Sequence, residues 1–200
     1  ETAKKSLSRM RGGVERIRSD PLVREAFILA NRSIWKSQEE PQVLGRQSGD
    51  FKWRPFQIAF QLLNLNGLVS TEPDDEFWKE REIVDLAWFP TGGGKTEAYL
   101  GLIAIIGFYR RLRYPEEERH PSVHAIMRYT LRLLTMDQAP RLVRLAMAMN
   151  LVSEDHKEEW RGDGAPHPFR VGMWIGSKSS PNRLDGGNKD RPDAKIMLRQ

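Results

Sequence analysis

A glycine-rich segment carries the strongest chemical signal in the chain. Residues 89–96 read Phe-Pro-Thr-Gly-Gly-Gly-Lys-Thr, between an apolar run at 83–89 and a helical pattern that begins at Lys95. Consecutive glycines let the backbone turn its N–H groups toward a polyphosphate, and the start of the next helix adds a favourable dipole. In such a loop Lys95 reaches the β- and γ-phosphates while the Thr96 hydroxyl coordinates Mg²⁺. The segment predicts an ATP–Mg²⁺ site, with Lys95 and Thr96 as its catalytic residues, formed by Thr91, Gly92, Gly93, Gly94, Lys95 and Thr96.

One position departs from the usual phosphate-binding pattern. The pattern G-x-x-x-x-G-K-[ST] begins with glycine, whereas Phe89 occupies that place here. Two alternatives to a nucleic-acid motor therefore stay open. One is a phosphate-loop enzyme of another class, such as a small-molecule kinase. The other is a non-catalytic scaffold that keeps a degenerate nucleotide pocket, which Phe89 favours.

The elements that would position this loop alternate along the second part of the chain. Apolar runs and helical patterns follow one another at 83–89, 95–114, 123–127, 137–150 and 169–175. This alternation is typical of an α/β fold with a largely parallel sheet. We therefore expect residues 51–200 to form an incomplete α/β domain. Pro140 is expected in the first turn of its helix, where a missing N–H costs little.

The first 50 residues have a different character. Residues 1–19 are basic and loosely helical, with Gly12-Gly13 as an expected interruption. Asp20-Pro21 reads as an N-cap followed by proline at the first helical position. A polar connector over 37–50 follows. We expect residues 1–50 to be an α-helical appendage, in which we identify no chemistry.

Composition limits the remaining possibilities. The chain has no cysteine, which excludes disulfides and thiolate metal sites among its 200 residues. Its longest strongly apolar stretch, 99–109, is shorter than the roughly 20 residues that a bilayer-spanning helix needs, so no membrane association is expected. A net charge of +5 permits a polyanionic partner. The acidic residues at 74–76 precede the glycine-rich loop and are expected to be solvated.

The form Pro-Thr-Gly-x-Gly-Lys-Thr, with a residue other than glycine at the first position, resembles superfamily 2 helicases and translocases. The resemblance implies a RecA-like phosphate-loop domain with a parallel sheet. It also implies that a glutamine upstream of the loop reads the adenine edge, since an amide can both donate and accept. Gln57, in the segment Arg54-Pro55-Phe56-Gln57, matches this glutamine, and Arg54 is assigned to the same cofactor-binding segment. Phe51 or Trp53 would stack on the base.

A third segment, at 128–138, looks like motif Ia of that superfamily, which grips the nucleic-acid backbone. Guanidinium, hydroxyl and amide donors suit phosphate oxygens without reading sequence. The predicted DNA contacts are Arg128, Thr130, Arg132 and Gln138. Because the spacing differs from the common form, a helix cap without a nucleic-acid role remains the alternative.

Within that superfamily, residues 51–182 resemble the helicase-like component of the DISARM anti-phage systems. The resemblance implies a bacterial, cytoplasmic, ATP-driven DNA helicase or translocase that works with the DISARM partner DrmB on invading DNA. These 200 residues contain no recognisable Walker B acid, arginine finger or second motor domain. The chain by itself is therefore expected not to turn over ATP.

Overall fold

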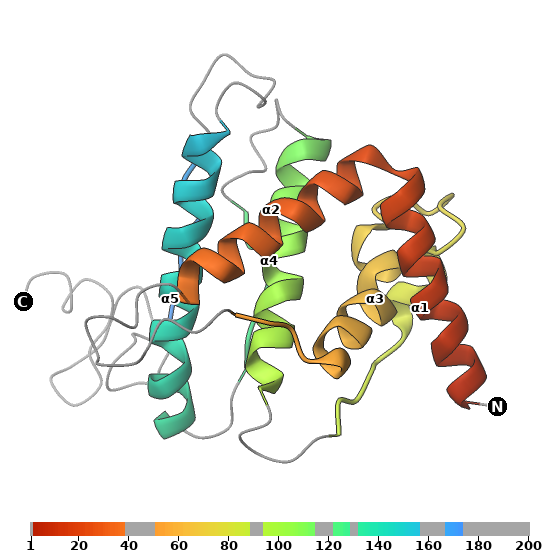
Figure 1. Ribbon diagram of the computed structural model, residues 1–200, viewed down its shortest axis with the longest axis horizontal. Helices are drawn as coiled ribbons and strands as arrows, with labels where there is room; N and C mark the ends of the chain where they lie inside the picture. Colours follow the sequence, from red (N-terminus) through yellow and green to blue (C-terminus); the bar gives the residue numbers. More distant parts are fainter. Residues whose placement is uncertain are drawn as a thin grey trace, which may run out of the picture. The chain divides into compact units, whose positions relative to one another are not determined.

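The computed structural model describes residues 2–38, 51–88, 94–114, 122–128, 132–156 and 167–173. In chain order its elements are α1 (Thr2–Ser19), α2 (Pro21–Gln38), α3 (Pro55–Val69), the 3-10 helix η2 (Trp78–Glu82), α4 (Lys95–Arg113) and α5 (Arg132–Asp155) (Figure 1). The chain divides into two compact units. The first contains Glu1–Ile126 and Arg144–Phe169, and the second contains Met127–Val143 and Arg170–Gln200.

The predicted α/β fold with a parallel sheet is wrong, because the residues that the structure describes form helices and no strand. The described parts of the three apolar runs lie outside the helices and pair with no neighbour as strands. The run at 83–89 was expected to form a buried strand of this sheet. Instead Val84, Leu86 and Trp88 are 95%, 82% and 87% exposed. An apolar run becomes a strand only when a neighbouring strand takes up its backbone N–H and C=O groups, and no described segment does so.

The core of the first unit is formed by α1, α2, α3 and α4 together with the second half of α5, which contributes Leu145, Met149 and Val152. α1 packs against α3, α2 against α4, and α3 against α4. Apolar side chains that are completely buried on α2 and α4 are Val23, Ala26, Ile34, Ala104, Ile105 and Phe108. The N-terminal helices therefore share one compact unit with α3 and α4. The expected boundary at residue 50 falls in 39–50, outside the described residues.

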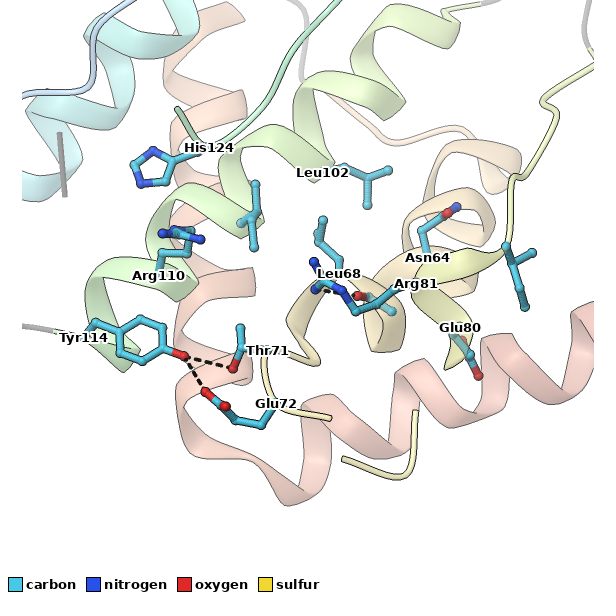
Figure 2. A pocket seen from close by; sticks show the side chains of 13 residues that line it. Asn64, Leu68, Thr71, Glu72, Glu80, Arg81, Leu102, Arg110, Tyr114 and His124 are labelled. Carbon is cyan, nitrogen blue, oxygen red and sulfur yellow. Dashed lines mark hydrogen bonds between the residues drawn. The ribbon is translucent and has the colours of Figure 1, made fainter. Parts of the chain in front are cut away.

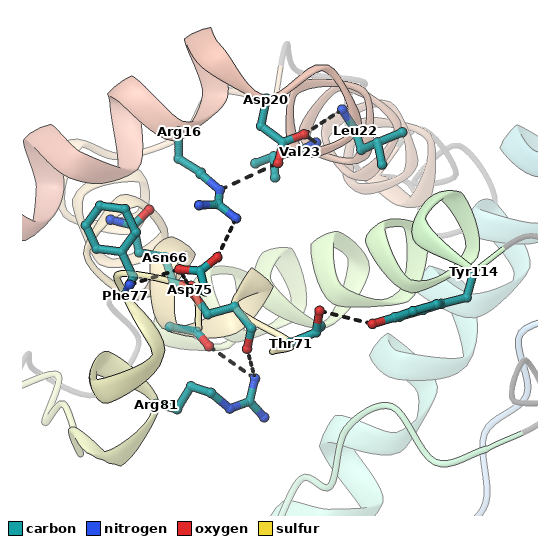
Figure 3. A network of polar contacts seen from close by, with 12 residues as sticks. Arg16, Asp20, Leu22, Val23, Asn66, Thr71, Asp75, Phe77, Arg81 and Tyr114 are labelled. Atoms are coloured by element: carbon teal, nitrogen blue, oxygen red, sulfur yellow. Dashed lines mark hydrogen bonds and ion pairs between the residues drawn. The ribbon is translucent and has the colours of Figure 1, made fainter. Parts of the chain in front are cut away.

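The start of α2 is confirmed by its capping bonds. The Asp20 Oδ1 atom accepts hydrogen bonds from the backbone N–H groups of Leu22 (2.9 Å) and Val23 (3.2 Å), and Pro21 is the first helical residue. Figure 3 shows both bonds. A carboxylate here satisfies N–H groups that have no partner within the helix. Asp20 and Pro21 therefore determine where α2 begins.

Two other helices differ from the prediction. α1 runs unbroken through the Gly12-Gly13 pair, which was expected to interrupt it. α5 begins at Arg132, not near residue 137, so Pro140 lies inside the helix and not in its first turn. A proline removes one backbone donor, and a helix of 24 residues retains the bonds on either side. The bounds of α4, Lys95–Arg113, agree with the expected 95–114.

Arg111, near the end of α4, is buried. Its side chain is 1% exposed, and its guanidinium carbon lies 3.3 Å from the centre of the Phe169 ring. It donates hydrogen bonds to the Ser153 hydroxyl (3.2 Å) and to the His167 carbonyl. Burial lowers the pKa of Arg111 to about 10, because a low-dielectric surrounding disfavours the charged form. This arginine therefore joins α4 to α5 and residues 167–169.

Asp75 was expected to be solvated but anchors a polar network (Figure 3). Its carboxylate accepts hydrogen bonds from the Ser70 hydroxyl (2.9 Å), the Phe77 backbone N–H (2.9 Å) and the Arg16 guanidinium (2.8 Å). Burial raises the pKa of Asp75, but the bonds from Phe77, Ser70 and Arg16 outweigh burial, so the pKa is lowered overall. The network ties α1 to the segment between α3 and η2.

This lowered pKa predicts acid-sensitive stability. A carboxyl whose pKa is lower in the folded state stabilises the fold above its unfolded pKa, and this contribution disappears as the pH falls through the folded value. We expect Asp75→Asn to reduce the free energy of unfolding by about 1–2 kcal/mol at pH 7 and by much less near pH 2.5. Urea denaturation at both pH values measures this difference. The exposed neighbour provides the control Asp74→Asn, and equal losses in the two variants at pH 7 would contradict the role of Asp75.

Candidate nucleotide-binding site

Gly94 is the first residue of the glycine-rich segment that the structure describes. This residue is the N-cap of α4 and has φ 85° and ψ 28°, the one positive φ among the described residues. Lys95 and Thr96 follow as the first two residues of the helix, and both are partly exposed. The other predicted loop residues, Thr91, Gly92 and Gly93, lie outside the described residues, as does Phe89.

Gln57, predicted to read adenine, lies against Gly94. Its side chain is 3% exposed. The Oε1 atom accepts a hydrogen bond from the backbone N–H of Arg54 (2.8 Å), and Nε2 donates one to the Gly94 carbonyl oxygen (2.7 Å). The structure thus brings together two residues that the sequence assigned to one site from separate segments.

The remaining residues of the predicted adenine pocket lie at the start of α3. Arg54 is the N-cap of this helix and is exposed. Phe51 and Trp53 meet edge to face, with ring centroids 4.9 Å apart. The Trp53 indole N–H donates to the Asn31 side-chain oxygen on α2 (2.6 Å). Trp53 is therefore tied to α2, whereas the stacking role of either ring stays a prediction.

A charged contact near the loop was missed by the sequence reasoning. Arg9 on α1 donates two hydrogen bonds to the Asp85 carboxylate, each 2.8 Å, and a third to Glu80 (3.3 Å). The hydrogen bond to Asp85 is the largest cause of the raised pKa of Arg9. A lone carboxylate within the apolar run at 83–88 was the available signal, since a partly buried charge requires a partner. The Arg9–Asp85 pair therefore ties the run at 83–88, which precedes the glycine-rich loop, to α1.

The described residues of the first unit also line a cavity of about 550 Å³. Figure 2 shows its walls, which are formed by residues of α3, η2 and α4 together with Thr71, Glu72, Ile83, Tyr114 and His124. Leu68, Leu102 and Ile106 supply apolar walls, and the Tyr114 hydroxyl bonds to Thr71 (3.0 Å). None of the predicted site residues lines this cavity. This cavity is therefore separate from the candidate nucleotide site.

The predicted DNA-contacting residues belong to the second unit. Arg128 is exposed. Arg132 is the first residue of α5, and Gln138 follows in the second turn of the helix and is partly exposed. Thr130 lies outside the described residues. Their contact with DNA stays a prediction.

Gly94, Lys95 and Thr96 are the part of the loop that the structure describes, and they lie where the start of α4 can bind a phosphate group. The first N–H groups of an α-helix have no acceptor within the helix, and they favour an anion placed there. Lys95 adds a cation and Thr96 a hydroxyl in the same turn, so these residues could hold a phosphate and its Mg²⁺.

Among the described residues no group of three His, Asp or Glu side chains could hold a metal ion. Nor does any described helix combine the length and apolar character that crossing a membrane demands.

Comparison with known proteins identifies a relative. No family model matches the chain. The chain is 45% identical over 139 residues to the DISARM protein DrmA of Bacillus paralicheniformis, which corresponds to 68% of this chain and 12% of that protein. The resemblance to the helicase-like DISARM component, predicted from the sequence, is confirmed. The chain is thus a relative of the DISARM protein DrmA and spans about 12% of its length.

Proposed function

We propose that this chain supplies the phosphate-binding part of an ATP-driven DNA helicase or translocase that acts in DISARM anti-phage defence. Lys95 and Thr96 would contact the terminal phosphates and Mg²⁺, and Gly92, Gly93 and Gly94 would turn the backbone toward them. DNA would be held through its backbone by Arg128, Thr130, Arg132 and Gln138, and DrmB would be the protein partner.

One observation carries this proposal. Gly94 adopts a left-handed conformation directly before Lys95-Thr96, at the first turn of a 19-residue helix. This conformation strongly favours glycine, and it places the lysine and the threonine where the helix N-terminus attracts anions. The 45% identity to DrmA supports the DISARM setting.

The test is ATP hydrolysis by the full-length protein that contains this chain, with and without single- and double-stranded DNA. We expect DNA to raise the steady-state rate about tenfold or more, because a motor couples hydrolysis to contact with its track. Activity that ignores DNA would favour a kinase-like enzyme, and nucleotide binding without hydrolysis would favour a scaffold. Either result would overturn the motor assignment.

A further inference from the structure

The Gln57 side chain joins two distant stretches of backbone. Its Oε1 atom accepts from the Arg54 N–H at the start of α3, and its Nε2 atom donates to the Gly94 carbonyl, 37 residues further along the chain. Both bonds are short, at 2.8 and 2.7 Å, and the side chain is 3% exposed. The amide is thus buried and engaged at both ends with backbone partners.

The Gln57 amide approaches Gly94 so closely that no side chain fits between them. A Cβ atom placed on Gly94 would lie 2.7 Å from Gln57 Nε2, which is closer than side chains pack. The residue also has φ 85°, which side chains other than glycine rarely adopt. Two independent requirements therefore select glycine here: the left-handed backbone and the close approach of the Gln57 amide.

The bond to the Gly94 carbonyl also orients the next N–H group. In a planar trans peptide the C=O and the N–H point in opposite directions, so a partner that holds the Gly94 oxygen also fixes the direction of the Lys95 N–H. That N–H belongs to the first turn of α4, where donors have no acceptor within the helix. It is one of the donors that a phosphate at this helix start would meet.

We propose that Gln57 is a positioning residue that holds the Gly94–Lys95 peptide in place for the terminal phosphates of the nucleotide. The ligand class that depends on Gln57 is then any Mg²⁺-polyphosphate, whatever its base. This inference rests on the proposed nucleotide site and changes the expected role of Gln57 from reading adenine to orienting a phosphate-binding N–H.

The chain offers a matched control one turn further along α3. Gln61 is 1% exposed, and its amide lies against Gly101 of α4 much as that of Gln57 lies against Gly94. Among the described residues neither Gln61 amide atom has a hydrogen-bond partner. Gln57→Met and Gln61→Met thus make the same replacement at buried positions of one helix, and the first alone removes hydrogen bonds.

The probes are ATP, GTP and inorganic tripolyphosphate, each with Mg²⁺, titrated calorimetrically into the full-length protein. We expect Gln57→Met to weaken binding of all three by about tenfold, as the loss of an ordinary hydrogen bond implies, with Gln61→Met unchanged. A loss confined to ATP would assign Gln57 to adenine and overturn the positioning role. Unchanged binding in Gln57→Met would also overturn it. If the wild-type protein binds none of the three, the proposed function fails, and this inference fails with it.

A second variant separates positioning from a general loss of structure. Gln57→Glu keeps the acceptor for Arg54, and its carboxyl can donate to the Gly94 carbonyl only when it is protonated. Relative to the wild type at each pH, tripolyphosphate binding by Gln57→Glu should be weakest near pH 8 and recover as the pH falls. A deficit that stays constant with pH would contradict the proposal. Because an ionised carboxylate at this buried position also destabilises the fold, urea denaturation of the variant at the same pH values is the control, and a binding deficit that only follows the loss of folded protein would contradict the proposal as well.

Discussion

Replacing Lys95 with alanine is expected to lower the ATP hydrolysis rate of the full-length protein by about 100- to 1,000-fold. Lys95 is the first residue of α4, directly after the left-handed Gly94. In a phosphate loop, such a lysine places its charge where negative charge develops on the transferring phosphoryl group. Removal of one such electrostatic contact typically costs two to three orders of magnitude. Steady-state hydrolysis with saturating DNA measures the loss.

A control of equal charge is available outside the loop. Lys79, on η2, is exposed, so Lys79→Ala removes the same charge from the same compact unit. We expect its hydrolysis rate to stay within about twofold of the wild type. If Lys95→Ala behaves like this control, the enzymatic assignment fails. If both variants are inactive, the loss does not come from a phosphate contact, and the assignment of Lys95 fails as well.

The largest expected effect on stability comes from Gly13→Ala. Gly13 is buried on α1, and a Cβ atom added to it would lie far inside van der Waals distance of the Leu62 carbonyl oxygen on α3. Backbone cannot yield as a flexible side chain can, so α1 and α3 would have to separate. We expect the free energy of unfolding to fall by about 2 kcal/mol, despite the better helix propensity of alanine. Urea denaturation measures the change.

The adjacent glycine is the natural comparison. A Cβ atom on Gly12 would lie 2.8 Å from the Asn66 Nδ2 atom, which is the end of a side chain. Among the described residues, the Asn66 amide atoms have no hydrogen-bond partner, so a small shift breaks no hydrogen bond. With the propensity gain of alanine, Gly12→Ala is expected to change stability by less than about 1 kcal/mol. Equal losses in Gly12→Ala and Gly13→Ala would show that helix separation is not the cause.

The candidate site was partly predictable because some of its features are local. Glycine before Lys95-Thr96 predicts a turn into a helix from the residue types alone, and the structure has Gly94 at that N-cap. The partners of Gln57 were not predictable, since the hydrogen bond to Gly94 spans 37 residues. Asp85, a carboxylate within an apolar run, indicated that it needs a partner. No residue near it in the sequence indicated that this partner is Arg9, 76 residues away. Contacts across such separations depend on how the helices pack.

The same division holds for the fold. The sequence by itself determined where two of the helices begin. Asp20-Pro21 marks the start of α2, and the helical pattern after the loop became α4. These features depend on neighbours within four residues along the chain. Tertiary structure alone decided that Gly12-Gly13 is a contact with α3 and not a break, and that Arg111 is buried. It also decided that the run at 83–88 forms no strand, because a strand exists only through hydrogen bonds to another segment, and an apolar pattern cannot specify which segment provides them.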